Sequence, residues 1–277
     1  MSHHHAPAPQ GPQRLPGIRH ILAIGSGKGG VGKTTVAVNL AVSLSKLGHR
    51  VGLIDADIYG PNVPTMLGAT RSPSIIGENL MEPILAHGVR FISIGLISPG
   101  DKPMIMRGPM LHQIIRQFLQ QVAWGELDYL LIDLPPGTGD VVISLVQTVP
   151  LSGAVVVSTG SAVALEDARK ALEMFHQVNV EIIGMVENMS QMTLPDGAIV
   201  DVFGAGATEQ TARQFNLPFL GSVDLDPGIR TGGDSGLPAA LAGDATARGK
   251  EFLAIAEKVV TRTQELAAKD GVVLEIS

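Results

Sequence analysis

The chain has 277 residues, of which 45% are hydrophobic, and its formal net charge at pH 7 is -6. This size and apolar content suit one large α/β domain, and the acidic balance provides no basic surface for nucleic acid or anionic membranes. The chain contains no cysteine, which excludes disulfides, thiol nucleophiles and thiolate ligands to zinc or iron–sulfur clusters.

The first 17 residues are rich in proline, glutamine and glycine and include histidines at positions 3–5. Such a segment buries too little apolar surface to fold alone, so we interpret residues 1–17 as a disordered tail or linker and residues 18–277 as the folded domain. The histidines are interpreted as part of this tail rather than as metal ligands. Because no stretch suits a signal peptide or a membrane span, we expect a cytoplasmic protein that contacts no membrane.

Strand-like apolar runs and segments with helical spacing alternate along the rest of the chain. Strands that are joined through helices pair in parallel, so this order predicts an α/β fold with a doubly wound, mostly parallel sheet. Residues 59–88 contain many turn formers and little periodicity, which indicates a mobile loop region. Strands are expected at 20–25, 50–55, 89–94, 129–133, 154–158, 182–186 and 219–223, and helices at 36–47, 111–122, 164–177, 208–215 and 245–268.

A glycine-rich segment lies between the first predicted strand and the first predicted helix. Its spacing, G-x-x-x-x-G-K-T, is that of a phosphate-binding loop, in which backbone N–H groups surround the phosphates, Lys33 neutralises charge and Thr34 can ligate magnesium. The dipole of the following helix favours an anion at the same place. Lys28 is a second lysine within this loop, where a cation is well placed to meet a phosphate. The candidate phosphate-binding residues are Gly27, Lys28, Gly29, Gly30, Val31, Gly32, Lys33, Thr34 and Thr35.

Three aspartates follow predicted strands: Asp55 and Asp57 after one, and Asp133 after another. The carboxyl ends of parallel strands meet at one edge of a sheet, so we expect these acids to converge with the loop lysines. Acids and lysines placed together in this way suffice for in-line transfer of a phosphoryl group to water, by positioning and charge stabilisation. The alternatives are a turn-capping role for Asp57 and a helix-capping role for Asp133.

These motifs resemble those of the Mrp/ApbC family of P-loop ATPases, which carries a deviant Walker A motif and is related to MinD, ParA and the nitrogenase iron protein. The resemblance extends from Leu15 to about Ala268. The glycine-rich motif marks the superfamily, whereas the other motifs point to Mrp. Those others are Asp55–Pro61 (DADIYGP), Arg107–Pro109 (RGP), Ile132–Asp140 (IDLPPGTGD), Val186–Ser190 (VENMS) and Asp224–Pro227 (DLDP).

The resemblance implies an ATP-driven homodimer in which hydrolysis depends on dimerisation. Lys28 would reach across to the phosphates bound by the partner subunit, while Lys33 would contact the β and γ phosphates of its own ATP. Thr34 would ligate Mg²⁺, and Asp133 would hold a magnesium-bound water.

The resemblance also implies roles for four residues outside the glycine-rich loop. Asp57 would orient or deprotonate the attacking water, and Asp55 and Asp57 would both belong to the magnesium shell, in part through water. The amide of Gly137 would sense the γ phosphate. Asn188 would recognise adenine, and the alternative for this residue is a loop former.

Family members commonly carry a C-P-x-C motif shortly after Asn-Met-Ser, and two cysteines from each subunit hold a bridging iron–sulfur cluster. Here Leu194 and Gly197 stand at the cysteine positions. Neither can ligate iron, so we do not expect this chain to hold a cluster in the family's manner. Asp196, Asp201 or the histidines at 3–5 would form an atypical site of oxygen and imidazole ligands.

Three functions are compatible with the sequence. The first is a slow, dimer-dependent Mrp-type ATPase that serves iron–sulfur cluster assembly or transfer, with thiols supplied by assembly or recipient proteins. The second is a nucleotide-switched scaffold or positioning ATPase of the MinD/ParA type without metal cargo. A membrane-bound protein of that type needs a basic amphipathic last helix, whereas residues 250–269 mix acidic and basic side chains. The third, a small-molecule kinase, needs a second substrate pocket, for which no motif is present.

Overall fold

A computed structural model describes residues 15–77, 79–97 and 108–274. Apart from 15–17, the predicted tail lies outside the described residues, and so do the histidines at 3–5 and Arg107 of the RGP motif. The division of the chain into a tail and one domain therefore stays a prediction.

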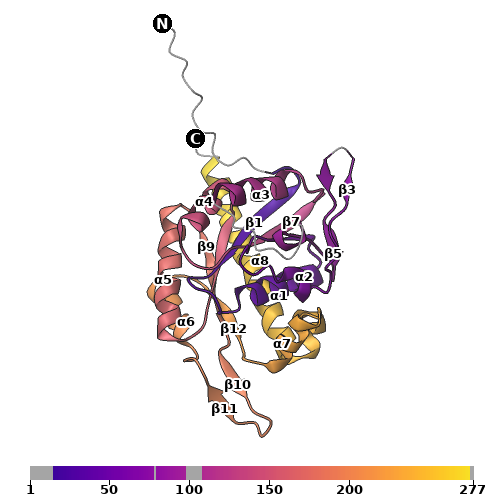
Figure 1. Cartoon of the computed structure of the whole chain (residues 1–277). Helices are drawn as coiled ribbons and strands as arrows, with labels where there is room; N and C mark the ends of the chain where they lie inside the picture. The colour runs from indigo at the N-terminus through magenta and orange to yellow at the C-terminus, as the bar shows by residue number, and fades with distance from the viewer. Residues whose placement is uncertain (1–14, 78, 98–107, 275–277) are drawn as a thin grey trace.

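The centre of the structure is one eight-stranded sheet. Its strands are β1 (Ile18–Gly25), β2 (Val51–Asp55), β5 (Ile84–Ala86), β6 (Val89–Ser93), β7 (Leu127–Asp133), β8 (Gly153–Ser158), β9 (Ile182–Asn188) and β12 (Phe219–Val223). They lie in the order β12-β9-β8-β1-β7-β2-β6-β5 (Figure 1). Neighbouring strands are parallel except at the edge, where β5 runs antiparallel to β6. The predicted doubly wound, mostly parallel sheet is confirmed.

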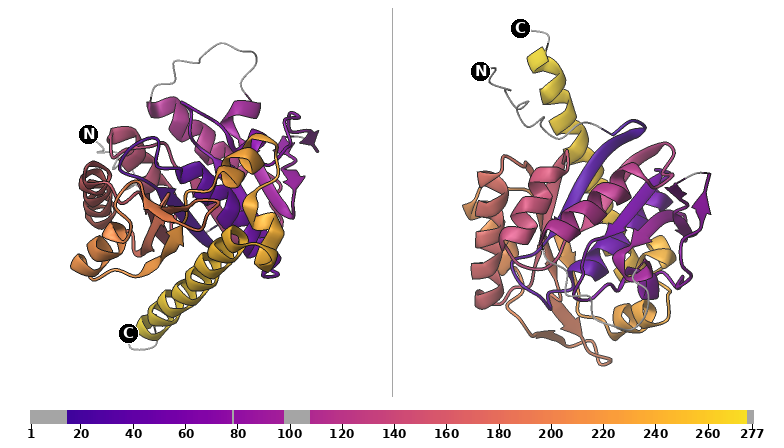
Figure 2. Two further views of the ribbon diagram at one scale, coloured as in Figure 1. Left: turned by 90° about the horizontal axis from the view of Figure 1, so that it is seen from below. Right: turned by 45° about the horizontal axis from the view of Figure 1, so that its top comes forward.

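Helices cover both faces of the sheet (Figures 1 and 2). The main ones are α1 (Lys33–Lys46), α3 (Gly108–Gln120), α4 (Asp140–Thr148), α5 (Ala162–Gln177), α6 (Ala207–Gln214) and α8 (Ala247–Leu274). Side chains alternate along each strand, so Leu22 and Ile24 of β1 enter one apolar core while Ile21 and Ala23 enter the other. The first core packs against α1 and α8, and the second packs against α3, α4, α5 and α6.

Several short elements of the structure were not predicted from the sequence. Within residues 59–88, which the sequence indicates as turn-rich, the structure has a helical turn, a small hairpin and the edge strand β5. The expected mobility of this segment stays a prediction. The hairpin is anchored by Met81, whose N–H donates to Gln121 O at 2.7 Å and whose carbonyl accepts from Ala123 N at 2.9 Å. The elements within residues 59–88 have only two to four residues each, which is too short to show a period. The short elements are α2 (Val63–Met66), β3 (Ile75–Ile76), β4 (Leu80–Met81), η1 (Ile94–Leu96), β10 (Gln191–Thr193), β11 (Ile199–Asp201), α7 (Pro227–Asp234) and η2 (Ala239–Ala245).

The strand ends bring the predicted acids together. In the register of the sheet, Asp55 of β2 lies beside Asp133 of β7, and Asp133 lies beside Ile24 of β1. Because β1 leads into the glycine-rich loop, that loop and both acids share the carboxyl edge of the sheet. The β10–β11 hairpin follows the end of β9 and projects from the body of the molecule (Figure 1).

The last helix, α8, packs on the sheet through residues that recur at helical spacing. Phe252, Ile255 and Val259 are buried, and the C-terminal turns extend beyond the body (Figure 2). Within the described part of the chain, no helix combines the length and the apolar character that a membrane span requires.

Candidate functional site

The glycine-rich segment forms a tight loop between β1 and α1. Gly30 and Gly32 have φ angles of +82° and +78°, the left-handed region that glycine enters without strain. Gly32 is the N-cap of α1 and offers no side-chain cap, so the first N–H groups of the helix can bind an anion. A methyl group on Gly27 would lie 2.0 Å from the Asp167 carbonyl oxygen, so only glycine lets the loop approach α5 this closely.

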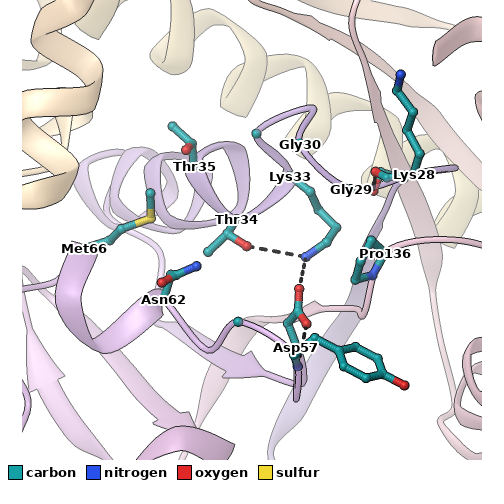
Figure 3. A pocket seen from close by; sticks show the side chains of 14 residues that line it. Lys28, Gly29, Gly30, Lys33, Thr34, Thr35, Asp57, Asn62, Met66 and Pro136 are labelled. Carbon is teal, nitrogen blue, oxygen red and sulfur yellow. Dashed lines mark hydrogen bonds and ion pairs between the residues drawn. The ribbon is translucent and has the colours of Figure 1, made fainter. Parts of the chain in front are cut away.

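A cleft of about 360 Å³ lies over this loop, which is a size typical of small-molecule sites (Figure 3). Besides the loop, it is lined by Asp57 and Tyr59 after β2, by Asn62 and Met66 of the following segment, and by Pro136 after β7. Sequence reasoning missed Asn62 and Met66, because their place in the cleft depends on the unpredicted helical turn α2.

The first two residues of α1, Lys33 and Thr34, both contact Asp133 at the end of β7. Lys33 Nζ lies 2.6 Å from Asp133 Oδ1, and Thr34 Oγ1 donates a hydrogen bond of 2.6 Å to Asp133 Oδ2. The Lys33 side chain is 5% exposed and Asp133 is fully buried, so water screens this ion pair little. Burial raises the pKa of Asp133, and the charge of Lys33 opposes that rise. A carboxylate beside a hydroxyl provides the hard oxygen ligands that Mg²⁺ prefers.

Asp57 faces the same lysine from the other side of the cleft. Its Oδ2 lies 3.8 Å from Lys33 Nζ (Figure 3). Its Oδ1 accepts a hydrogen bond of 3.1 Å from Tyr59 N. Asp57 therefore caps the turn with one carboxylate oxygen and faces Lys33 in the cleft with the other.

Asp55 is fully buried and holds the backbone around Asp57. Its Oδ1 accepts from Asp57 N at 3.3 Å, and its Oδ2 accepts from Ser93 Oγ at 2.8 Å and from Val63 N at 3.3 Å. Burial, together with the nearby charge of Asp133, raises the pKa of Asp55 to about 7. Sequence reasoning missed Ser93, because a single serine at a strand end carries no motif signal.

Gly137 and Asn188 contact the glycine-rich loop through hydrogen bonds. Gly137 N donates to Ser26 O at 3.0 Å, so the segment after β7 rests on the loop. Asn188 Nδ2 donates to Val31 O at 2.9 Å, and a methyl group on Gly32 would lie 2.1 Å from this nitrogen. The predicted contacts of Gly137 with the γ phosphate and of Asn188 with adenine stay predictions.

Lys28 also lines the cleft, but its side chain points away from Lys33 (Figure 3). Among the other loop residues, Gly29 and Thr35 line the cleft, whereas Val31 is buried against the apolar core. The structure therefore places all of the predicted loop residues at or directly beside one cleft.

The residues at the missing cysteine positions form a turn that its own backbone closes. Leu194 N donates to Ala198 O at 2.8 Å, and Gly197 N donates to Leu194 O at 2.9 Å. The carboxylates of Asp196 and Asp201 accept from amides of the same segment, at 3.0 Å and 2.6 Å. In the described ranges, no three His, Cys, Asp or Glu side chains lie close enough to hold a metal ion. The residues present do not fit an iron–sulfur cluster.

Comparison with known proteins agrees with this geometry. Residues 17–260 match the family described as ParA, NUBPL iron-transfer P-loop NTPase. The iron–sulfur cluster carrier protein of Synechocystis is 48% identical over 256 residues, which cover 90% of this chain and 72% of that protein. The carrier protein of Deinococcus radiodurans is 53% identical over 230 residues, which cover 82% of this chain and 65% of that protein.

Solved structures show the same fold. A nucleotide-binding protein from Archaeoglobus fulgidus, in complex with ADP, has a TM-score of 0.72 and 35% identity, over 85% of this chain and 92% of its own. MinD from Pyrococcus horikoshii, complexed with Mg-ADP, has a TM-score of 0.65 and 24% identity, over 87% of this chain and 96% of its own. At this identity the likeness is one of fold alone. The resemblance inferred from the motifs is confirmed: the chain belongs to the iron–sulfur cluster carrier (Mrp/NUBPL) family of P-loop NTPases.

Proposed function

We propose that this protein binds MgATP in the cleft over the glycine-rich loop and hydrolyses it to ADP and phosphate. The observation that carries the proposal is the convergence of Lys33 and Thr34 on the buried carboxylate of Asp133, at 2.6 Å each. P-loop NTPases hold phosphates with such a lysine and Mg²⁺ with such a hydroxyl and acid. The ADP described for the Archaeoglobus relative supports a nucleotide ligand.

Binding uses groups that lie at or beside the cleft, some of which change partners. The loop amides and the first amides of α1 bind the phosphates, and Lys33 exchanges its contact with Asp133 for oxygens of the β and γ phosphates. The hydroxyl of Thr34 would ligate Mg²⁺, Asp133 would hold a water of the ion, and Asp55 would support Asp57 and the strand end behind them. The ion supplies charge neutralisation at the phosphate oxygens. Asn188, which already touches the loop, contacts adenine.

Asp57 orients or deprotonates the attacking water. One of its carboxylate oxygens is held by Tyr59 N, which fixes the side chain, while the other lies near Lys33 in the cleft. The amide of Gly137 exchanges its contact with Ser26 O for the γ phosphate. This exchange makes the segment after β7 sensitive to hydrolysis.

Two copies of the protein close face to face around the nucleotide, and Lys28 reaches the phosphates of the partner subunit. The Lys28 side chain lines the cleft and points away from Lys33, a direction that is compatible with this role (Figure 3). Hydrolysis by an isolated subunit is therefore slow.

The iron–sulfur cluster that the family carries needs thiolate ligands, which this chain lacks. With no cysteine in the sequence and a self-closed turn from Leu194 to Gly197, thiolates come from assembly or recipient proteins, and this chain contributes the nucleotide switch. The same observation favours a second candidate, a scaffold or positioning ATPase of the MinD/ParA type without metal cargo.

The nucleotide proposal is tested by measuring MgATP binding and phosphate release for the wild type and Lys33→Ala. Lys46→Ala is a matched control, because Lys46 is an exposed lysine of the same helix. We expect binding and hydrolysis to be lost in Lys33→Ala and retained in the control. Phosphate release by Lys33→Ala at the wild-type rate would contradict the proposal.

The cargo proposal is tested by anaerobic reconstitution with iron and sulfide, followed by gel filtration, iron analysis and a visible spectrum. We expect no bound iron in the isolated chain. Stoichiometric iron with cluster absorption would instead mean that this chain provides its own ligands, and substitutions at Asp196 and Asp201 would then identify them.

A further inference from the structure

The end of strand β9 carries two polar side chains, Glu187 and Asn188, that reach different parts of the molecule. Glu187 is buried, with 1% of its surface exposed, and it has no role in the hydrolysis proposed above. Neighbouring residues of a strand point to opposite faces, and here Asn188 contacts the glycine-rich loop whereas Glu187 contacts the segment around the β10–β11 hairpin. One strand end therefore joins the candidate nucleotide site to the hairpin.

The carboxylate of Glu187 holds both ends of the hairpin segment. Its Oε1 accepts from Ser190 Oγ at 2.6 Å and from Gly206 N at 2.8 Å, and its Oε2 accepts from Thr208 N at 2.9 Å. Ser190 directly precedes β10, and Gly206 follows β11 as the N-cap of α6. A shift of Glu187 therefore acts on the entrance and the exit of the hairpin together.

The bonding pattern requires a carboxylate at position 187. The two backbone amides, Gly206 N and Thr208 N, donate to different oxygens of the side chain. A glutamine would present its NH₂ group to one of these amides in either orientation, and the amide would lose its acceptor. The negative charge itself is favoured by the N-terminal end of α6.

Close backbone contacts lie both where Asn188 meets the loop and at the base of the hairpin. Toward the loop, a methyl group on Gly32 would lie 2.1 Å from Asn188 Nδ2. At the base of the hairpin, a methyl group on Gly160 would lie 1.9 Å from Gly204 O. The hairpin itself has only two short strands, so its order depends on the contacts at its base.

We propose that Glu187 is a positioning residue that couples nucleotide binding at the glycine-rich loop to the position of the β10–β11 hairpin. A ligand that moves the loop at Val31 acts on Asn188, and the strand end transmits the change to Glu187 and from there to both ends of the hairpin. The inference rests on the proposed function in one respect, because it requires a nucleotide at the loop.

Hydrogen–deuterium exchange of peptides from residues 190–206, with and without MgADP, tests this coupling. We expect MgADP to slow exchange about fivefold or more in the wild type, which is the lower end of usual couplings between sites. In Glu187→Gln this nucleotide-dependent change should be lost, although the variant still binds MgADP. Glu209→Gln is the matched control, because Glu209 lies in the first turn of α6 and forms an exposed ion pair with Arg213 at 2.7 Å on the same helix.

A second variant, Ser190→Ala, removes the hydrogen bond from Ser190 to Glu187 at the hairpin entrance and keeps the bonds from Gly206 N and Thr208 N. It tests the coupling even if Glu187→Gln does not fold. It should reduce the response to MgADP. If Glu187 had only a structural role, the substitutions would change hydrogen exchange equally with and without MgADP. The inference would therefore be overturned if the ratio of the exchange rates with and without MgADP were the same in the variants as in the wild type. A wild-type hairpin that ignores MgADP, with binding verified by calorimetry, would overturn it too. Absence of MgADP binding by the wild type would instead refute the proposed function, and the inference with it.

Discussion

Replacing Glu251 with glutamine should stabilise the protein at alkaline pH. Glu251 lies on α8 beside the Asp224–Pro227 motif, and its Oε2 accepts from Asp224 N at 3.2 Å. Burial, together with the charges of Asp224 and Asp226, raises the pKa of Glu251 from 4.5 to about 7. Arg248 pairs with Asp226 at 2.7 Å and offsets part of its charge, so burial is the main cause of the raised pKa of Glu251.

The raised pKa fixes the sign of the effect. The native state favours the protonated carboxyl group, so this contribution to stability is complete below pH 4.5 and is lost as the pH rises through about 7. The difference between the two pKa values corresponds to about 3 kcal/mol, which solvent screening of a partly exposed group reduces to about 1–2 kcal/mol. For a domain of this size, we expect a change in Tm of about 2–8 °C.

The assay is thermal unfolding of the wild type, Glu251→Gln and Glu257→Gln at pH 5 and pH 9. Glu257 is exposed on the same helix and controls for the loss of one negative charge. We expect Glu251→Gln to match or fall slightly below the wild type at pH 5 and to exceed it at pH 9. The same Tm difference at both pH values would show that Glu251 does not titrate between them, and the reasoning would be refuted.

Three further substitutions test the site. Asp57→Asn should lower the kcat for ATP hydrolysis about 100-fold or more while ATP binding is retained, and wild-type turnover would remove Asp57 from the catalytic role. Lys28→Ala should abolish ATP-dependent dimerisation in analytical ultracentrifugation and lower kcat about 100-fold or more, whereas an unchanged dimer would contradict its action across the interface. Lys33→Met leaves the buried Asp133 without its cation and should lower the free energy of unfolding in urea by about 3–5 kcal/mol. Lys46→Met on the same helix should cost less than about 0.5 kcal/mol, and equal losses would mean that the Lys33 ion pair contributes nothing.

The centre of the site could be predicted from the sequence because two strong regularities agree there. Motif spacing places Lys33 and Thr34 at the start of a helix, and strand periodicity places Asp133 at the end of a strand in the same sheet. Parallel strands then force a contact between residues 100 positions apart, which the structure shows at 2.6 Å. The element types follow from the same periodicity, which is strong in long buried strands and amphipathic helices.

The remainder depends on tertiary contacts that leave no periodic trace. Asp55 could be predicted at the sheet edge, but its bonds to Ser93 and Val63 depend on where β6 and α2 fold. Residues 59–88 form short elements because neighbouring backbone groups pair with them, as Met81 does with Gln121, and not because of their own pattern. The sequence shows Glu187 only as part of the Val186–Ser190 motif and does not predict its contacts. The three groups that donate hydrogen bonds to its carboxylate come from three separate positions in the chain.

The β10–β11 hairpin combines the main departure from the family's sequence pattern with the coupling proposed here. Its tip is closed by the backbone of Leu194 and Gly197, so its shape requires no metal. The orientation of the hairpin depends on contacts at its base, because a two-stranded hairpin is at best marginally stable alone. At that base Glu187 bonds both ends of the hairpin segment, and it lies one residue from the side chain that contacts the glycine-rich loop. A nucleotide at the loop therefore has a short route to the hairpin that does not pass through its tip, and a chain without cysteine can retain a nucleotide-dependent hairpin.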